Sequence, residues 1–349
     1  MKKVLIKIVT VLLLCLILTS LIACSGVNGT KEVTEKILNF EPLNTIKEGN
    51  SNIYLIVKLM DSDYWQVIID GVRDAADACN MNVYYSGTNN ETDWKGQQKL
   101  LEKAIENGAD AIILAPDDSV ELISDLQNIR KLDIPVILVD TVVNDDVFDV
   151  CFMTDNYIAG QNAAEEMISQ LKLMGHDSSD VLEVGVLVGT ANSQTINERL
   201  AGFYQYWASN APNKWTIIGD LQNSNGDSEL ANKLTEEFLN TYPNVDGLYG
   251  TNNGPTKALC STVMKLNRTD VVVVGFDYSD EMRQFIESDD YIGATVLQRQ
   301  YDMGYRAVES IVSLLDDERI DAKYEDTGVI IVNHNNMNDS DVIEVTNRN

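Results

Sequence analysis

The chain has 349 residues, with 26 Lys and Arg against 54 Asp and Glu, so its formal net charge at pH 7 is −28. This excess of acid argues against a nucleic-acid-binding protein and against a surface that holds anionic lipid through basic side chains. Apolar residues make up 44% of the chain and charged residues 23%, as in globular proteins, and the length accommodates two domains. With His176 and His334 as its two histidines, the chain does not offer a histidine-rich metal site.

The start of the chain has the features of a secretion signal. Three lysines precede an apolar run over residues 8–18, which is too short for a comfortable membrane span. Small and apolar residues then lead to Cys24. This stretch resembles a bacterial lipoprotein signal, which implies removal of residues 1–23 and a diacylglyceryl thioether at the Cys24 sulfur. An ordinary signal peptide with an incidental cysteine is the alternative.

The segment that follows the signal is polar and weakly patterned. Residues 24–50 are therefore predicted to be a tether between a lipid anchor and the folded body. Loss of the signal removes three lysines and no acid, which changes the net charge from −28 to −31. The body keeps Cys79, Cys151 and Cys260, and this odd, widely spaced set does not indicate a disulfide framework.

The next part of the chain alternates short apolar runs with amphipathic stretches. Ile68, Val72, Ala75 and Cys79 have helical spacing, and predicted strands begin about every 25–30 residues, as in βαβ units. The predicted strands here cover residues 53–59, 83–86, 111–115, 136–140 and 150–154. The predicted helices cover residues 64–79, 94–107 and 120–132.

The same rhythm continues through the second half of the chain. Further strands are predicted at residues 184–188, 215–219, 247–249 and 271–276. Further helices are predicted at residues 158–173, 195–209, 229–240, 256–266 and 280–287. The strands are continuous apolar runs, which is typical of parallel sheets covered by helices on both faces. We therefore predict an α/β fold with two Rossmann-like lobes.

Polar and aromatic residues follow the predicted strands, at the edge where open parallel sheets bind ligands. They include two aromatic residues, several amides, two or three carboxylates and one arginine. Carboxylates and amides take paired hydrogen bonds from vicinal hydroxyls, and aromatic faces cover the C–H face of a sugar ring. The pattern therefore fits a neutral polyhydroxylated ligand.

Eight segments in this order resemble the periplasmic sugar-binding proteins of the ribose/galactose type, from about residue 52 to about residue 332. These segments are Asp61-Ser62-Asp63-Tyr64-Trp65 with Asp70-Gly71, Gly108-Ala109-Asp110-Ala111-Ile112-Ile113, Ile134-Pro135-Val136-Ile137 ending in Asp140, Thr154-Asp155-Asn156, Glu198-Arg199-Leu200-Ala201-Gly202-Phe203, Tyr242-Pro243-Asn244-Val245 through Asn252-Asn253, Val274-Gly275-Phe276-Asp277 and Ala294-Thr295-Val296-Leu297-Gln298. Each segment alone is a weak signal, whereas eight in order are a strong one. The resemblance implies the type I periplasmic-binding-protein fold, in which a multi-segment hinge joins two lobes.

The resemblance also implies the ligand-binding residues. It assigns stacking on the ligand to two aromatic residues and hydrogen bonding to polar residues of both lobes and the hinge. The predicted set is Asp61, Tyr64, Trp65, Asp140, Asn197, Arg199, Asn252, Asp277 and Gln298. Arg199 lies two residues beyond the ribose-type position at Asn197, and Thr141 follows Asp140 where ribose-binding members have a basic residue. These two departures argue against ribose itself as the ligand, and residues 223–227 lack the galactose-type calcium pattern.

Most of the predicted site residues also have a structural alternative. Asp140 and Asp277 could cap helices, and Asn252 could be a turn residue. Gln298 could bridge backbone segments, and Arg199 could be the partner in a structural ion pair. The aromatic pair could belong to the core or the surface, and Asp61 could be solvated.

The resemblance implies ligand capture by closure of the hinge. The N-terminal lobe is expected to comprise residues 51–155 and 299–326, and the C-terminal lobe residues 156–298 and 327–349. We expect a monomeric, lipid-anchored extracytoplasmic protein that delivers a monosaccharide or related polyol to an ABC-transporter permease, with no cofactor and no metal. The alternative partner is a membrane histidine kinase or chemoreceptor. An enzyme is not favoured, because the chain lacks a Gly-x-Ser-x-Gly elbow, a phosphate loop and Cys/His metal spacing.

Overall fold

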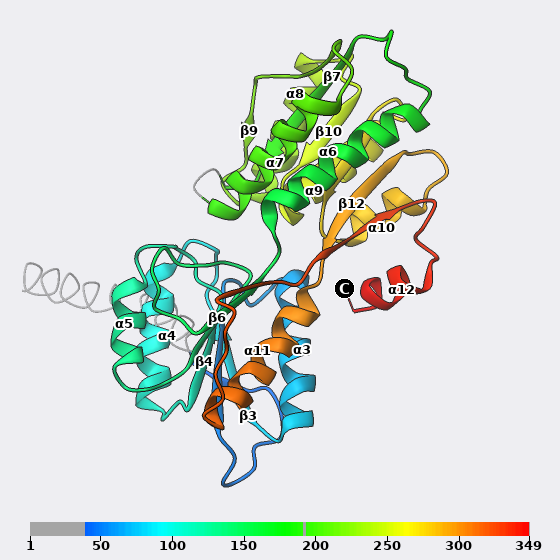
Figure 1. Ribbon diagram of the computed structural model, residues 1–349. Coiled ribbons are helices and arrows are strands. Elements are labelled where there is room, and N and C mark those ends of the chain that lie inside the picture. Colours follow the sequence, from blue (N-terminus) through cyan, green and yellow to red (C-terminus); the bar gives the residue numbers. More distant parts are fainter. Residues whose placement is uncertain (1–38, 191–192, 349) are drawn as a thin grey trace, which may run out of the picture.

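Two sheets, each flanked by helices on both faces, organise the chain into two lobes (Figure 1). The computed structural model describes residues 39–190 and 193–348. In these residues the two sheets have seven strands each, and the predicted α/β fold of two lobes with mainly parallel sheets is confirmed. The predicted signal peptide and Cys24 lie outside the described residues.

The N-terminal lobe contains a sheet in the order β1-β3-β2-β4-β5-β6-β13. Its strands are β1 (Glu41–Pro42), β2 (Asn52–Val57), β3 (Asn82–Gly87), β4 (Ala111–Leu114), β5 (Val136–Val139), β6 (Val150–Met153) and β13 (Tyr324–Asp326). Its helices are α3 (Asp63–Cys79), α4 (Trp94–Glu106), α5 (Ile123–Arg130) and α11 (Gln300–Leu315). All neighbours in this sheet are parallel except β1 and β3.

The C-terminal lobe contains a sheet in the order β14-β12-β11-β10-β7-β8, with β9 also paired to β7. Its strands are β7 (Leu182–Val188), β8 (Trp215–Ile217), β9 (Gln222–Asn223), β10 (Gly247–Gly250), β11 (Val272–Phe276), β12 (Gly293–Gln298) and β14 (Val329–Asn333). Its helices are α6 (Asn156–Leu173), α7 (Gln194–Asn210), α8 (Ser228–Thr241), α9 (Asn253–Lys265) and α10 (Asp280–Glu287), followed by α12 (Ser340–Thr346). The antiparallel pair here is β12 with β14.

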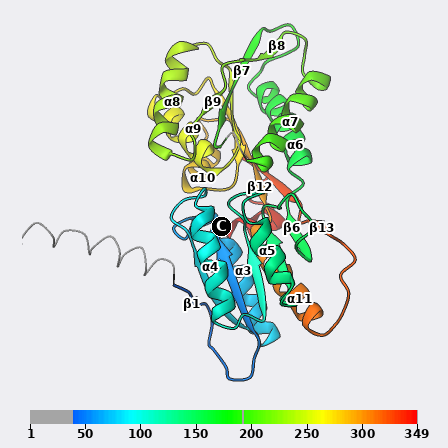
Figure 2. The same cartoon turned by 90° about the vertical axis from the view of Figure 1, so that its left-hand side faces the viewer.

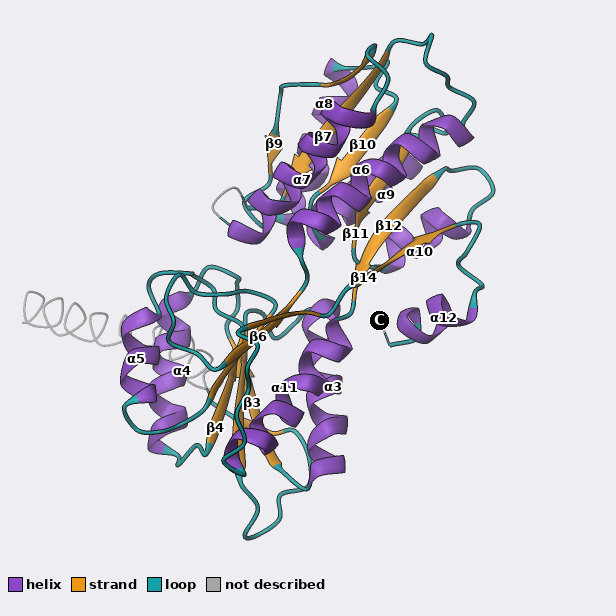
Figure 3. Ribbon diagram, viewed as in Figure 1, coloured by secondary structure: helices purple, strands orange, loops and turns teal. Residues whose placement is uncertain are grey.

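The continuous apolar strands supply two hydrophobic cores per lobe. In β2, Ile53 and Leu55 pack with α3 and α11, whereas Tyr54 and Ile56 pack with α4 and α5 on the other face. Successive side chains of a strand point to opposite faces, so a sheet covered twice needs apolar residues at every position. Figures 2 and 3 show the helices on both sides of each sheet.

In each lobe one pair of helices crosses at glycines that permit very close approach. A Cβ atom at Gly71 would lie 2.2 Å from a backbone oxygen of α11, and one at Gly304 would lie 2.2 Å from a backbone oxygen of α3. The C-terminal lobe repeats this arrangement, with Gly160 of α6 against the Arg199 carbonyl and Gly202 of α7 against that of Tyr157. The second crossing thus fixes the backbone that carries Arg199.

The chain passes between the sheets in three places, which link the lobes in Figures 1 and 2. These passages lie between β6 and α6, between β12 and α11, and between β13 and β14. At the first passage the Asp155 side chain caps α6 by accepting from Ile158 N at 3.0 Å. The Asp326 carboxylate accepts from the N–H groups of Asp155 at 2.9 Å and Gly328 at 2.8 Å, so two passages are tied together.

The C-terminal segment from α12 to Arg348 contacts both lobes, although the sequence placed it with the second. Val342 and Val345 pack in a core cluster of the C-terminal lobe. Beyond the helix, the Arg348 guanidinium lies 4.1 Å from the ring centroid of Tyr301 and 3.9 Å from Asp302 Oδ1, both on α11. The segment after β14 therefore spans the hinge.

The predicted tether extends too far into the folded body. Residues 24–38 lie outside the described residues, but β1 pairs with the edge strand β3. Leu43 N donates to Val83 O at 2.8 Å, and Asn44 Nδ2 donates to Met81 O at 2.9 Å. These contacts satisfy edge groups that an unpaired β3 would expose, so the folded body includes residues 39–50.

No helix of the described residues is both long and apolar enough to cross a membrane.

The glycine crossing in the second lobe makes a stability prediction. We expect Gly160→Ala to lower the free energy of unfolding by about 1–3 kcal/mol, because the added methyl group lies 2.1 Å from the Arg199 oxygen. Urea unfolding measures this change.

The matched control is Gly254→Ala, also in a helix, whose Cβ meets no atom within 4 Å. Alanine there should stabilise the helix by up to about 1 kcal/mol. Equal effects of the two substitutions would contradict the role of the crossing.

Candidate functional site

An aspartate with left-handed backbone follows a buried parallel strand in each lobe. Asp140 follows β5 with φ of 65°, and Asp277 follows β11 with φ of 68°. This conformation is uncommon for residues that carry a Cβ atom, although aspartate tolerates it better than most. A neighbouring strand holds each turn, because Asp140 N donates to Phe152 O at 2.9 Å and Asp277 N to Val296 O at 3.1 Å. The lobes thus present equivalent carboxylates at the carboxyl ends of their sheets.

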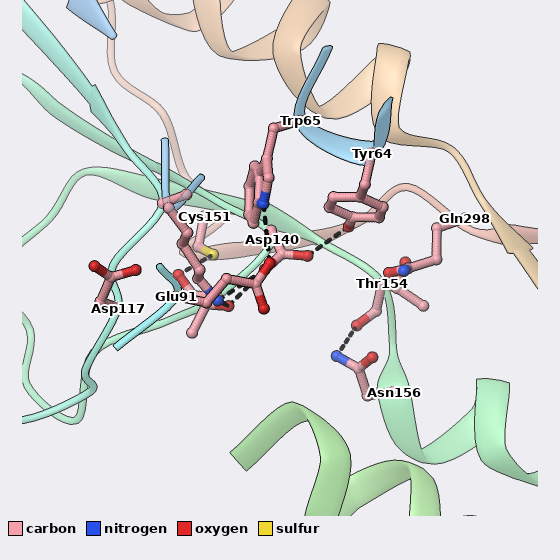
Figure 4. Close-up of polar contacts among 12 residues, drawn as sticks. Tyr64, Trp65, Glu91, Asp117, Asp140, Cys151, Thr154, Asn156 and Gln298 are labelled. Carbon is pink, nitrogen blue, oxygen red and sulfur yellow. Dashed lines mark hydrogen bonds and ion pairs between the residues drawn. The ribbon is translucent and has the colours of Figure 1, made fainter. Parts of the chain in front are cut away.

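Donors of the N-terminal lobe engage both oxygens of Asp140. The Tyr64 hydroxyl donates to Oδ1 at 2.5 Å, as drawn in Figure 4. The Thr141 hydroxyl and the Lys58 ammonium donate to Oδ2 at 2.6 and 3.2 Å. Burial alone would raise the pKa of Asp140, but the nearby Lys58 charge and the two hydroxyl groups outweigh burial and lower it. Asp140 is therefore an ionised acceptor at neutral pH.

A buried threonine and a buried glutamine connect the loops around this carboxylate. The Thr88 hydroxyl lies 2.6 Å from Lys58 O and 2.8 Å from Asn90 O, so it joins the ends of β2 and β3. Gln97, which is 0% exposed, donates to Ala115 O at 2.8 Å and accepts from Asp117 N at 2.8 Å. The strand ends of the N-terminal lobe are therefore held in place by side chains of the lobe itself.

The two predicted stacking aromatics occupy different environments. Tyr64 is partly exposed at the start of α3, with its hydroxyl on Asp140. Trp65 is 2% exposed and packs in the core cluster between the sheet and α3. Its indole N–H donates to Glu91 Oε1 at 3.1 Å (Figure 4). Trp65 therefore both fills the core and positions Glu91 on the loop after β3.

Asp277 is the corresponding carboxylate of the C-terminal lobe. Gln298, which ends β12 at the passage to α11, donates to Asp277 Oδ1 at 2.9 Å. Burial raises the pKa of Asp277 to about 6, and the Arg199 charge and the Gln298 amide oppose this shift incompletely. The carboxylates of Asp140 and Glu91 raise it further. Asp277 is therefore less well compensated than Asp140.

Arg199 is a buried cation beside the hinge. Its Nε donates to Asn156 Oδ1 at 2.9 Å and its Nη1 to Thr251 O at 3.0 Å. Its guanidinium carbon lies 3.9 Å from the ring centroid of Phe276. Among the described residues no carboxylate forms an ion pair with it. An amide oxygen, a backbone carbonyl and an aromatic face thus hold Arg199 in the second lobe.

The two groups of side chains face each other across the lobes. Burial and the neighbouring Asp140 hold the pKa of Tyr64 well above its usual value, and Asp277 raises it further. Arg199 of the second lobe lowers the pKa values of both Tyr64 and Asp140. Coulomb interactions weaken with distance, so charges of one lobe that shift pKa values in the other lie near those groups. The structure therefore brings Tyr64, Asp140, Arg199 and Asp277 together, with Gln298 at the hinge end.

The remaining predicted residues are more peripheral. Asn252 precedes α9 and is half-buried, and its side chain packs against the backbone at Gly189. Its Oδ1 accepts from the Thr251 hydroxyl at 3.3 Å. Asn197 lies on an exposed position of α7, and Asp61 lies on the exposed loop between β2 and α3.

Three polar residues near the site were missed from the sequence. Lys58 follows β2 and Glu91 follows β3. Asp117 lies in the loop after β4, three residues beyond Leu114. The same rule that identified Asp140, a polar residue after a buried parallel strand, was available for Asp117. Figure 4 shows Asp117, Glu91 and Asp140 on the N-terminal side of the site.

Asp117 makes a pH-dependent stability prediction. Burial raises its pKa to about 8, and no described residue pairs with its buried Oδ1. A carboxyl that is ionised only in the unfolded chain lowers stability as the pH rises from about 4 toward 8. We expect Asp117→Asn to raise the free energy of unfolding at pH 8 by at least about 1 kcal/mol and to leave it unchanged near pH 4.

Denaturant unfolding at both pH values, with exposed Asp290→Asn as the control, measures the effect. A shift of equal size at pH 4 and pH 8 would show that packing, not ionisation, is responsible.

The described residues contain no cluster of three or more His, Cys, Asp or Glu side chains that could hold a metal ion.

Comparison with known proteins places this arrangement in context. Residues 53–319 match the family described as periplasmic binding protein domain. A D-apiose import binding protein from Actinobacillus succinogenes is 26% identical over 260 residues, which cover 74% of this chain and 80% of that protein. A D-ribose/D-allose-binding protein from Pseudomonas aeruginosa is 23% identical over 303 residues, which cover 84% of this chain and 91% of that protein.

Solved structures share the two-lobed fold. A carbohydrate transporter solute-binding protein from Agrobacterium radiobacter, in complex with D-arabinose, has a TM-score of 0.79 and 24% identity, and the match covers 86% of this chain and 99% of that one. An ABC transporter solute-binding protein from Agrobacterium vitis, with bound D-fucose, has a TM-score of 0.74 and 26% identity over 84% and 99% of the two chains.

Proposed function

The chain belongs to the periplasmic binding protein family, and we propose that it captures a monosaccharide or related polyol outside the cytoplasm for an ABC-transporter permease. The observation that carries this proposal is the pair of facing carboxylates, Asp140 and Asp277, one from each lobe. Each can accept hydrogen bonds from ligand hydroxyls, and Tyr64 offers an aromatic surface beside them. The proposal assigns ligand binding and no chemical reaction to the site, so the ligand is released unchanged.

Delivery for transport is favoured over sensing by the names of the relatives. The protein from Actinobacillus succinogenes is an import binding protein, and the neighbour from Agrobacterium vitis is an ABC transporter solute-binding protein. A chemoreceptor or histidine kinase as the partner would use the same closed form. The binding site alone fits both transport and sensing, and the names of the relatives support transport.

Capture proceeds by closure of the two lobes around the ligand. Three chain passages join the lobes, and the Asp326 carboxylate ties two of them together. In this proposal these passages form one hinge about which the lobes rotate as rigid bodies. A ligand that touches Asp140 and Asp277 together is bound fully in the closed form only, so it shifts the population toward that form. The lobes in this proposal comprise residues 39–155 with 299–326 and residues 156–298 with 327–349.

The proposal includes a lipid anchor at Cys24 and a monomeric folded body. Its support is the sequence that precedes Cys24, where a short apolar run ends in small residues. Two or more acyl chains hold a protein at a membrane because each buried CH₂ contributes about 0.8 kcal/mol. The net charge of −31 then keeps the body away from anionic headgroups.

We expect Cys24→Ala to abolish lipid attachment and to release the protein from the membrane fraction or leave it unprocessed. Metabolic labelling with a fatty acid, followed by fractionation, measures both effects. Cys79→Ala is the matched control and should remain labelled. A labelled, membrane-bound Cys24→Ala protein would refute the anchor.

The sugar-binding proposal is tested by a thermal-shift screen of the chain without its signal against pentoses, hexoses and polyols. A ligand that binds the folded state raises the unfolding temperature. For the sugar with the largest shift, we expect Asp277→Ala to weaken calorimetric affinity about 5- to 100-fold, because a ligand hydroxyl loses its acceptor.

Asp290→Ala, an exposed change in the same lobe, should bind as the unchanged chain does. Affinity that is equal for Asp277→Ala and Asp290→Ala would exclude Asp277 from the site.

A further inference from the structure

Lys58 brings a positive charge to Asp140 from a strand that is not adjacent to it. Lys58 follows β2, whereas Asp140 follows β5, and β4 lies between these two strands. The Lys58 Nζ atom lies 3.2 Å from Asp140 Oδ2 and 2.6 Å from the Thr141 hydroxyl oxygen. The residue after Asp140 is Thr141, which carries no charge. The cation beside this carboxylate is Lys58, which comes from the end of a different strand.

Lys58 is held at its backbone and at the end of its side chain. Its backbone carbonyl accepts from the Thr88 hydroxyl at 2.6 Å, and its ammonium lies 5.6 Å from the ring centroid of Trp65. The side chain is 13% exposed. Burial of an ammonium group is unfavourable unless the group is paired. Lys58 therefore stays in its ion pair with Asp140.

We propose that Lys58 is a specificity-determining residue, which balances the charge of Asp140 so that this half of the site accepts neutral polyhydroxylated ligands and disfavours amino sugars. The inference rests on the proposed sugar-binding function and names its ligand class. A ligand ammonium at Asp140 would meet the Lys58 charge at short range, and like charges at such distances repel strongly in a buried site.

The charges around Asp140 determine what happens without Lys58. Asp140 faces Lys58, Tyr64, Thr141 and Cys151 from its own lobe. Across the lobes it faces the charges of Arg199 and Asp277, with Glu91 nearby on the loop after β3. With Lys58 the site has three carboxylates, Asp140, Asp277 and Glu91, against two cations, Lys58 and Arg199. Removal of the Lys58 charge leaves Arg199 as the cation near these carboxylates and Asp140 without its direct ion-pair partner, which favours a cationic ligand at Asp140.

The binding experiment uses calorimetry at pH 6.5 with D-galactose and D-galactosamine, D-glucose and D-glucosamine, and D-ribose and D-allose. Where D-galactose or D-glucose binds, the unchanged chain should bind it more tightly than the corresponding amino sugar. Lys58→Met should weaken binding of the neutral sugar about tenfold or more and reverse or abolish the preference. Lys58→Arg should keep the preference for the neutral sugar, and exposed Lys99→Met should change nothing.

A ligand-free experiment separates the charge of Lys58 from its packing. In the unchanged chain the lowered pKa of Asp140 contributes stability above the unfolded value of about 3.9, and this stability is lost only in acid. In Lys58→Met the largest effect that opposes the burial of Asp140 is missing, so the pKa of Asp140 rises. The loss of unfolding free energy relative to the unchanged chain should therefore grow from pH 4 to pH 7.

The double variant Lys58→Met, Asp140→Asn should lose this pH-dependent part. That control also excludes Asp117, whose pKa Lys58 lowers as well. A loss that is equal at every pH would assign Lys58 a packing role and overturn the inference.

The binding results distinguish failure of the Lys58 inference from failure of the proposed sugar-binding function. If the unchanged chain binds a neutral sugar and Lys58→Met retains the same affinity and preference, the inference fails and the sugar-binding function stands. If the unchanged chain prefers an amino sugar, the inference again fails alone. If no sugar in the panel binds, the proposed function fails and the specificity inference fails with it.

Discussion

The binding site depends on how two buried carboxylates are compensated by their surroundings. Asp140 has an ammonium group and two hydroxyl groups of its own lobe on its oxygens, and its pKa is lowered despite burial. Asp277 has one amide donor, and burial raises its pKa to about 6. Asp140 is therefore the better compensated carboxylate, and Asp277 has more unused accepting capacity. In the proposed function a ligand that donates hydrogen bonds to both carboxylates joins the two lobes, and this requirement links binding to closure.

The rest of the fold holds these two carboxylates in position. Each lies in a left-handed turn at the carboxyl end of its strand, after β5 or β11, and a hydrogen bond to an adjacent strand secures each turn. The glycine crossing of α6 and α7 fixes the backbone of Arg199, which lies against Asn156 at the first chain passage. The cation near both carboxylates therefore contacts the chain passage between β6 and α6 through Asn156.

Much of this organisation could be predicted from the sequence, because apolar runs of strand length and helical spacing are local signals. The strand-end rule found Asp140 and Asp277, and the order of the segments indicated the fold. Contacts between distant elements were not accessible. Nothing in the sequence indicates that Lys58 reaches past β4 to Asp140, that β1 covers the edge of β3, or that Trp65 is buried while Tyr64 stays at the site. These features depend on side-chain direction and on which elements become neighbours.

Small-angle X-ray scattering of the chain without its signal tests the central claim, that one ligand joins the two lobes. The radius of gyration would be measured without sugar and with saturating D-allose, D-ribose or D-arabinose, whichever gives the largest thermal shift. The account predicts a smaller radius with sugar for the unchanged chain, and a smaller decrease for Asp277→Ala at a sugar concentration that just saturates the unchanged chain. A radius that stays the same when the unchanged chain is saturated with a tightly bound sugar would contradict capture by closure.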